Sequence, residues 1–215
     1  MATVLVSNLP YLLRGALVTI QLAAVVVILG TSLGIGLGIM ATARHRFVQR
    51  IITAYIFVLR GIPVLVVMFL GYYAFPAIGF RLNAYVAVGI AHLIYVSAFV
   101  AEIVRGSILA VPPGQVAAAK SLGMRRRKVL TQVVLPQAAR IAIPPLLNNS
   151  LTAVKQTSYA SVVGAWELTY AAREIVERTL ASFQIFLGVM TIYFAICYPL
   201  ALLARWCERR LAFAH

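Results

Sequence analysis

Long apolar stretches dominate this chain and restrict the folds open to it. A bilayer core of ~30 Å needs about 20 mostly apolar residues per helix. The chain has 215 residues, of which 62% are hydrophobic and 11% charged, whereas soluble domains carry nearer ~25% charged residues. Backbone groups in hydrocarbon must satisfy their own hydrogen bonds, so these stretches are predicted to be helices. The five predicted spans are Leu17–Thr42, Ile51–Ala74, Ala84–Val104, Ile141–Val154 and Phe183–Trp206.

These spans predict an all-α integral membrane protein that forms one transmembrane domain over residues 1–215. The first apolar stretch follows Arg14 and continues to Ala43, which is too long for a signal-peptide core of ~7–15 residues. It is therefore expected to be retained as the first span. The fourth span is short and contains Asn148 and Thr152, so neighbouring helices are expected to shield it from lipid.

The positive charge predicts an orientation rather than a nucleic-acid site. The 19 Lys and Arg residues face only five acids, and they lie between apolar runs instead of on one polar surface. Thirteen cations fall in the first loop, the third loop and the C-terminal tail, against four on the opposite side. The positive-inside rule then predicts a cytoplasmic C-terminus and an N-terminus outside. The thirteen are Arg44, Arg46, Arg50, Arg105, Lys120, Arg125, Arg126, Arg127, Lys128, Arg140, Arg205, Arg209 and Arg210.

The absence of aspartate from the sequence excludes several chemistries. All five acids are glutamates, so an aspartyl-phosphate pump, an aspartic dyad and a nucleotide site with Asp on its magnesium are ruled out. No nucleophile and base stand in a catalytic pattern, and no enzyme activity is expected. Cys197 and Cys207 would lie roughly 15 Å apart in one helix, so neither a disulfide nor a metal site is predicted. Any ATP must be hydrolysed by another chain.

A glycine stripe in the first span predicts close helix packing. Gly30, Gly34 and Gly38 recur every four residues, which leaves one helix face nearly bare. The partner is either another helix of the same chain or a second copy.

Charged residues interrupt two of the spans. Arg60-Gly-Ile-Pro63 breaks the second span, and a proline there invites a kink. An arginine at that depth needs a partner or water, so Arg60 either anchors the structure or serves transport. Glu102, near the end of the third span, and Arg105, just beyond it, are three residues apart and are predicted to form an ion pair.

Other polar residues in the spans are candidates for a transport route. His92, Tyr95 and Ser97 lie in the third span, and His92 either packs between helices or acts as an intramembrane ionisable group. Asn148, Thr152, Lys155 and Tyr159 recur at helical spacing and form one polar stripe. Such a stripe either hydrogen-bonds to another helix or lines a route for a polar solute.

The cytoplasmic loop over about residues 106–139 is too patterned for a simple connector. The turn signal Val111-Pro-Pro-Gly114 precedes a predicted short helix over Gln115–Leu122, with Val116, Ala119 and Leu122 on one face, and Gly123 ends it. A second helix is predicted over Arg125–Leu135, closed by Pro136. The pair is either a docking element for a cytoplasmic partner or an interfacial amphipathic segment held on anionic lipid by its cations.

The loop sequence Gly114-Gln-Val-Ala-Ala-Ala-Lys-Ser-Leu-Gly123, followed by Val133-Val-Leu-Pro-Gln-Ala138, resembles the EAA loop of permease subunits of ATP-binding-cassette (ABC) importers. Three further motifs resemble the polar amino-acid branch of that family. They are Glu102-Ile-Val-Arg-Gly106, Arg60-Gly-Ile-Pro63 and Pro144…Asn148…Lys155-Gln-Thr-Ser158, and the match extends from about Arg14 to Arg210.

The resemblance implies a permease subunit for a polar amino acid in the bacterial inner membrane. Its implied partners are a second permease chain, identical or different, two cytoplasmic ATPases that hold ATP and magnesium, and a solute-binding protein. The loop's first helix would seat in a groove of the ATPase. Two positions depart from the family: Ala117 replaces a glutamate, and Gln156 replaces an aspartate. The implied coupling residues are Gly114, Gln115, Ala117, Ala118, Ala119, Lys120, Leu122 and Gly123.

Roles for the membrane residues follow from the stripe and the breaks. The predicted substrate pathway comprises His92, Tyr95, Ser97, Asn148 and Thr152. Arg60, Pro63, Glu102, Arg105 and Lys155 are predicted to be structural or gating residues. The alternative function is a self-sufficient ion- or proton-coupled carrier or channel, which would favour paired intramembrane acids and an inverted repeat.

Overall fold

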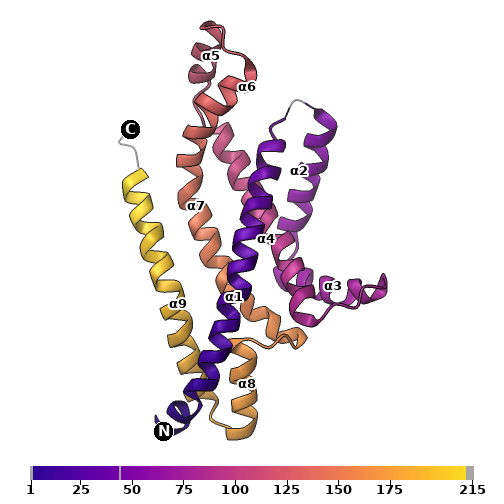
Figure 1. Cartoon of the computed structure of the whole chain (residues 1–215), viewed down its shortest axis with the longest axis vertical. Helices are drawn as coiled ribbons and strands as arrows, with labels where there is room; N and C mark the ends of the chain where they lie inside the picture. The colour runs from indigo at the N-terminus through magenta and orange to yellow at the C-terminus, as the bar shows by residue number, and fades with distance from the viewer. Residues whose placement is uncertain (1, 44, 212–215) are drawn as a thin grey trace.

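The computed structural model describes residues 2–43 and 45–211, and Arg44, one of the cations counted above, lies outside them. Within these ranges every regular element is a helix, and the longer helices run side by side along one axis (Figure 1). The elements are α1 (Ala2–Met40), α2 (Arg46–Gly61), α3 (Val64–Ala77), α4 (Ala84–Leu109), α5 (Pro113–Ser121), α6 (Arg126–Lys128), the π-helix η1 (Val129–Val134), α7 (Leu135–Gln156), the 3-10 helix η2 (Thr157–Val163), α8 (Leu168–Thr179) and α9 (Ser182–Leu211).

The glycine stripe packs α1 against α4 of the same chain. A Cβ on Gly30, Gly34 or Gly38 would meet Val96, Val100 or Val104 of α4 at 2.5–3.1 Å. Because glycine carries no side chain, the two backbones approach closely along this seam. The prediction of close packing is confirmed, and its partner is an internal helix.

The predicted second span is not one helix. The chain breaks at Ile62 and Pro63, and α3 leaves α2 at an angle of 107°, so that it projects sideways from the bundle (Figure 1). Pro63 has no backbone N–H, and its ring forces the residue before it out of the helical region. Ile62 accordingly has φ −107° and ψ 136°. The predicted span Ile51–Ala74 therefore consists of two helices that meet at a sharp break, instead of one kinked helix.

The predicted helix over Arg125–Leu135 does not end at Pro136. The chain stays helical from Arg126 through Gln156, by way of α6, the π-helical turn η1 and α7. Pro136 follows just after the π-helical turn η1, and an irregular turn of this kind can accommodate a residue that has no backbone N–H. The loop and the predicted fourth span are therefore parts of one continuous helix.

Among the described residues, three helices are long and apolar enough to cross a membrane by length and composition, over Val4–Met40, Ala84–Leu109 and Ser182–Arg210, and the bent pair α2–α3 is a fourth candidate. The predicted fourth span, Ile141–Val154, lies within α7, which packs on α4, α9 and α1 but is too polar to count among these candidates. Its crossing of the membrane stays a prediction.

The first helix begins at Ala2, with Pro10 inside it, well before the predicted Leu17.

Candidate transport pathway and coupling element

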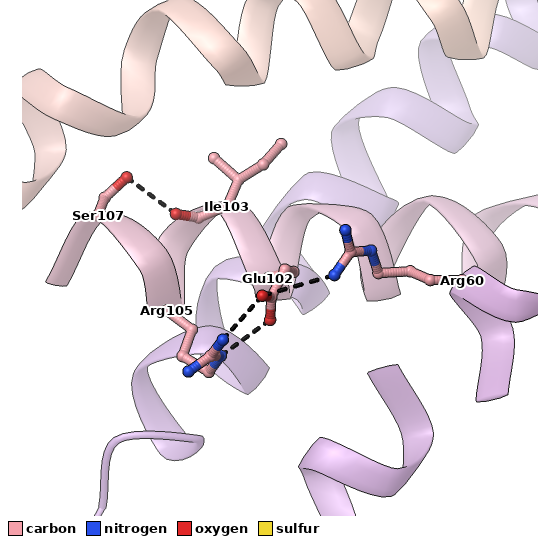
Figure 2. A network of polar contacts seen from close by, with 5 residues as sticks. All are labelled: Arg60, Glu102, Ile103, Arg105 and Ser107. Atoms are coloured by element: carbon pink, nitrogen blue, oxygen red, sulfur yellow. Dashed lines mark hydrogen bonds and ion pairs between the residues drawn. The ribbon is translucent and has the colours of Figure 1, made fainter. Parts of the chain in front are cut away.

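Arg60, Glu102 and Arg105 form one charged cluster, which connects the end of α2 to α4 (Figure 2). Arg105 donates from Nε to Glu102 Oε2 and from Nη2 to Glu102 Oε1, both at 2.8 Å. Arg60 Nη1 lies 3.5 Å from Glu102 Oε1, and its guanidinium lies 5.6 Å from the centre of the Phe99 ring. The predicted Glu102–Arg105 pair is confirmed, and Arg60 has the partner that its position requires.

The cluster fixes the point where the second span breaks. Arg60 occupies the last turn of α2, where a cation is favoured by the helix dipole, and Pro63 begins the new direction two residues beyond Gly61. A shared carboxylate thus holds the broken end of α2 to the half of α4 that leads into the loop.

The three predicted pathway residues on α4 lie inside the bundle. His92, Tyr95 and Ser97 are all buried. His92 Nε2 lies 3.3 Å from Gln156 Oε1 at the end of α7, while its Nδ1 has no hydrogen-bond partner among the described residues. Ser97 Oγ lies 2.6 Å from the hydroxyl of Tyr55 on α2. His92 therefore packs between α4 and α7, in contact with the residue that departs from the family pattern.

The predicted polar stripe is exposed and runs from α7 into η2, which contains Tyr159. Asn148, Thr152, Lys155 and Tyr159 are all exposed. Asn148 donates from Nδ2 to Glu208 Oε1 of α9 at 3.1 Å, and the Thr152 hydroxyl donates to the Asn148 carbonyl. Lys155 forms no ion pair within the described ranges. The structure thus separates Asn148 and Thr152 from the buried group on α4.

The loop presents α5 at one end of the molecule (Figure 1). The predicted helix is confirmed, with bounds Pro113–Ser121. Ala119 is buried, but Leu122 is 82% exposed, so the predicted face with Val116 and Ala119 was wrong at that residue. The helix ends before Leu122, and Gly123 with φ +74° turns the chain away. The other coupling residues named from the sequence, Gly114, Gln115, Ala117, Ala118 and Lys120, are exposed.

Sequence reasoning missed Glu167, which joins three helices at the opposite end of the molecule. Its carboxylate is fully buried. It accepts hydrogen bonds from the Thr19 hydroxyl of α1 at 3.1 Å, the Tyr193 hydroxyl of α9 at 3.0 Å and the Tyr170 N–H of α8 at 3.0 Å. Burial raises the pKa of this carboxyl, and the hydrogen bonds it accepts oppose that rise. The position of this acid just before an amphipathic segment was the signal available in the sequence.

A second cluster reinforces this end. The Tyr11 hydroxyl donates to Glu174 Oε2, and Trp166 Nε1 donates to the same oxygen at 2.9 Å. The Tyr11 and Trp166 rings meet edge to face with centres 5.6 Å apart. Polar contacts and the apolar cluster around Leu12, Leu168 and Ile175 therefore hold the start of α1 against α8.

These features define a membrane transport subunit with a helical coupling loop at one end. The chain belongs to the family described as binding-protein-dependent transport system inner membrane component, whose family model matches residues 34–213. Members are permease subunits of ABC importers, in which a separate chain hydrolyses ATP. The sequence-based resemblance is confirmed, and the self-sufficient carrier is set aside.

Named relatives and solved structures agree with this family. The chain is 37% identical over 203 residues to the L-cystine transport system permease protein TcyB of Bacillus subtilis, covering 94% of this chain and 87% of the relative. It is 35% identical over 214 residues to the octopine transport system permease protein OccM of Rhizobium radiobacter, covering 93% and 87%. A crystal structure of an amino acid ABC transporter with histidines has a TM-score of 0.90 at 32% identity, covering 96% of both chains.

Proposed function

We propose that this chain forms half of the pathway by which a polar amino acid crosses the bacterial inner membrane. The observation that carries the proposal is the exposed polar stripe of α7, which includes Lys155. Placing a lysine against hydrocarbon is costly, and intramembrane charges generally face a protein interior or a water-filled path. A second permease chain facing the stripe would enclose such a path.

The substrate class is inferred from the relatives together with the polar groups of this chain. Relatives are named for transport of L-cystine, glutamine and octopine, which carry amino-acid groups. The exposed amide of Asn148 and hydroxyl of Thr152 offer hydrogen bonds to such a solute. His92, Tyr95 and Ser97 are buried in this conformation, so they reach the solute only when α4 and α7 separate.

The proposed orientation places α5 in the cytoplasm and the start of α1 outside. Exposed cations around α5 and at the end of α9 support this orientation through the positive-inside rule. Two cytoplasmic ATPases, with ATP and magnesium, then act on α5. A solute-binding protein delivers the substrate at the opposite end, where α8 and the Glu167 cluster lie.

The mechanism follows the continuous helix. Movement of α5 on closure of the ATPases passes through η1 into α7 and displaces the polar stripe. Through α4, the Arg60–Glu102–Arg105 cluster carries the same movement to the break at Pro63. In this scheme the pathway is gated by four residues, Arg60, Pro63, Glu102 and Arg105. Lys155 gives the polar stripe its positive charge.

Thiol accessibility in the native complex tests the pathway. Cys197 and Cys207 are first replaced by serine, and single cysteines are placed at Thr152 and, as a control, at Phe194, which is exposed on the apolar helix α9. A charged, water-soluble thiol reagent should modify the cysteine at 152, substrate should slow that reaction, and the control should stay unmodified. A cysteine at 152 that resists the reagent in every transport state would overturn the proposed pathway.

Native mass spectrometry of the tagged chain tests the assembly. Two ATPase copies and two permease chains are expected in one particle. The mass of the permease pair distinguishes two identical chains from two different ones. A particle that contains this chain alone would contradict the proposed partners.

A further inference from the structure

The turn that follows α5 carries a concentration of unpaired positive charge. No acidic residue stands between Glu102 and Glu167 in the sequence. Lys120, at the end of α5, and the four consecutive cations Arg125–Lys128 are all exposed, and none of them forms an ion pair with any described residue. We call these five residues the basic tip. Because no carboxylate offsets them, they produce a positive potential at this surface.

The position of the basic tip favours a protein partner over the lipid surface. Cations bind anionic lipid headgroups when they lie within about one Debye length, ~8 Å at physiological salt. In Figure 1, α5 and α6 form the extreme end of the molecule, farther along its long axis than the nearby ends of α2 and α9. Those ends carry their own exposed cations, among them Arg46 and Arg209, which suit the lipid surface. The turn between α5 and α6 lies beyond them (Figure 1).

We propose that the basic tip docks onto an acidic surface of the cytoplasmic ATPase that receives α5. This inference rests on the proposed function, because it concerns the same partner. In the loops that this one resembles, the coupling helix contributes a glutamate, and Ala117 stands at that position here. The contact therefore lacks that negative charge, and in this proposal the cations after α5 supply it with positive charge instead, with guanidinium groups on the permease and carboxylates on the ATPase.

The helix α5 and the cations that follow it would contribute differently to docking. The surface of α5 exposes the small residues Gly114, Ala117 and Ala118, which permit close approach to a groove. Arg125, Arg126 and Arg127 present planar donor groups that bind carboxylates through two hydrogen bonds at once. The surface of α5 would thus fit the groove of the ATPase, and the cations that follow α5 would bind its carboxylates.

Salt dependence of the native complex tests this inference. The tagged full chain is purified from its own membranes with its ATPase, and ATPase retention is measured between about 0.1 M and about 1 M NaCl, over which the screening length falls from about 10 Å to about 3 Å. Retention should fall steeply with salt. A variant with R125Q, R126Q, R127Q and K128Q should bind the ATPase at least about tenfold more weakly at low salt, with little further loss at high salt.

A matched variant removes four cations at the same end, by R46Q, R50Q, R205Q and R209Q. These residues are exposed, so the change in net charge is equal, and retention should stay near that of the parent chain. In a second reciprocal test, reversing the four tip cations to glutamate should be compensated by lysines at the acids of the ATPase groove.

The outcomes separate this inference from the proposed function. If no ATPase accompanies the parent chain at any salt, the proposed function fails and the inference fails with it. If the ATPase is retained equally by the parent and the R125Q–K128Q variant at all salt concentrations, only the acidic docking surface is overturned. If the variant keeps its ATPase but no longer binds phosphatidylglycerol vesicles, the basic tip contacts lipid, and the docking proposal is likewise overturned.

Discussion

Gly34 of α1 lies so close to Val100 of α4 that a Cβ on the glycine would stand 2.5 Å from the Cβ of the valine. The Ser97 carbonyl oxygen would be only 2.7 Å away. Because backbone atoms and a β-branched residue line the contact, a larger side chain at Gly34 would fit only if the two helices moved apart. The seam between α1 and α4 is therefore among the least adjustable parts of the molecule.

The variant G34V should destabilise the protein by about 1–3 kcal/mol, the usual range for overpacking. Its matched control is G36V, two residues along the same helix, where an added Cβ meets nothing within 4 Å. Both changes alter helix propensity equally, so thermal unfolding in detergent isolates the packing effect. Equal stability of the two variants would contradict the close seam.

The shared carboxylate predicts a specific pattern in a double-mutant cycle. E102Q removes the counter-charge of both arginines and should destabilise the chain more than R60Q does. Exposed ion pairs contribute about 0.2–1 kcal/mol, and Arg60 is partly exposed, so its coupling to Glu102 should fall in that range. The double variant R60Q/E102Q should be no less stable than E102Q alone. Additive effects, measured by thermal unfolding, would show that the two residues do not interact.

Gly123 should matter because of its backbone conformation, and not because a larger side chain would clash with its neighbours. It has φ +74°, and an added Cβ would meet no atom within 4 Å. G123V should therefore strain the turn after α5 and uncouple substrate uptake from ATP hydrolysis while assembly persists. G123N, whose residue adopts the left-handed conformation more readily, should retain most of the coupling. The measurement is uptake per ATP hydrolysed in proteoliposomes, and unchanged coupling in G123V would refute a role for this turn.

Glu167 should make stability depend on pH. Burial raises its pKa in the folded chain, so the folded state binds its proton more tightly than the unfolded state does. Stability is then greatest below the unfolded pKa of about 4.3 and declines as pH rises through the folded pKa. E167Q carries no titrating group there and should lose this part of the dependence.

The comparison uses thermal unfolding of the parent chain and E167Q across a pH series in one detergent. A parent chain whose stability follows the same pH profile as E167Q would show that Glu167 keeps its ordinary pKa. T19V is a useful companion, because it removes one hydrogen bond to the carboxylate and leaves the titrating group in place.

Local patterns in the sequence predicted the features that depend on neighbouring residues. The spacing of Gly30, Gly34 and Gly38 predicted the helix seam, and the three-residue spacing of Glu102 and Arg105 predicted their ion pair. Helix periodicity predicted α5 to within about a residue at its C-terminal end. These features were accessible because one helix face, or one turn, determines each of them.

The missed features depend on contacts between distant segments or on small differences in backbone energy. The burial of Glu167 depends on hydroxyl groups from Thr19 and Tyr193, 148 and 26 residues away, as well as on the local Tyr170 N–H. The sequence around Pro63 permitted either a kink or a full break, and α3 packs against α4 beyond that break. Pro136 was predicted to end the helix because no sequence pattern indicated the π-helical turn that precedes it.

The continuity of the helix from Arg126 to Gln156 gives the molecule a mechanical arm about 46 Å long, at about 1.5 Å per residue. Most of this arm is α7, which packs on α4 and α9, and these helices can serve as a fulcrum. In a lever of this kind the two ends swing in opposite directions, and the ratio of the arms sets the size of the response. In the proposed orientation, the polar stripe would tilt against the direction in which the α5 end is driven, so a single stroke would shut one side of the membrane while it opens the other.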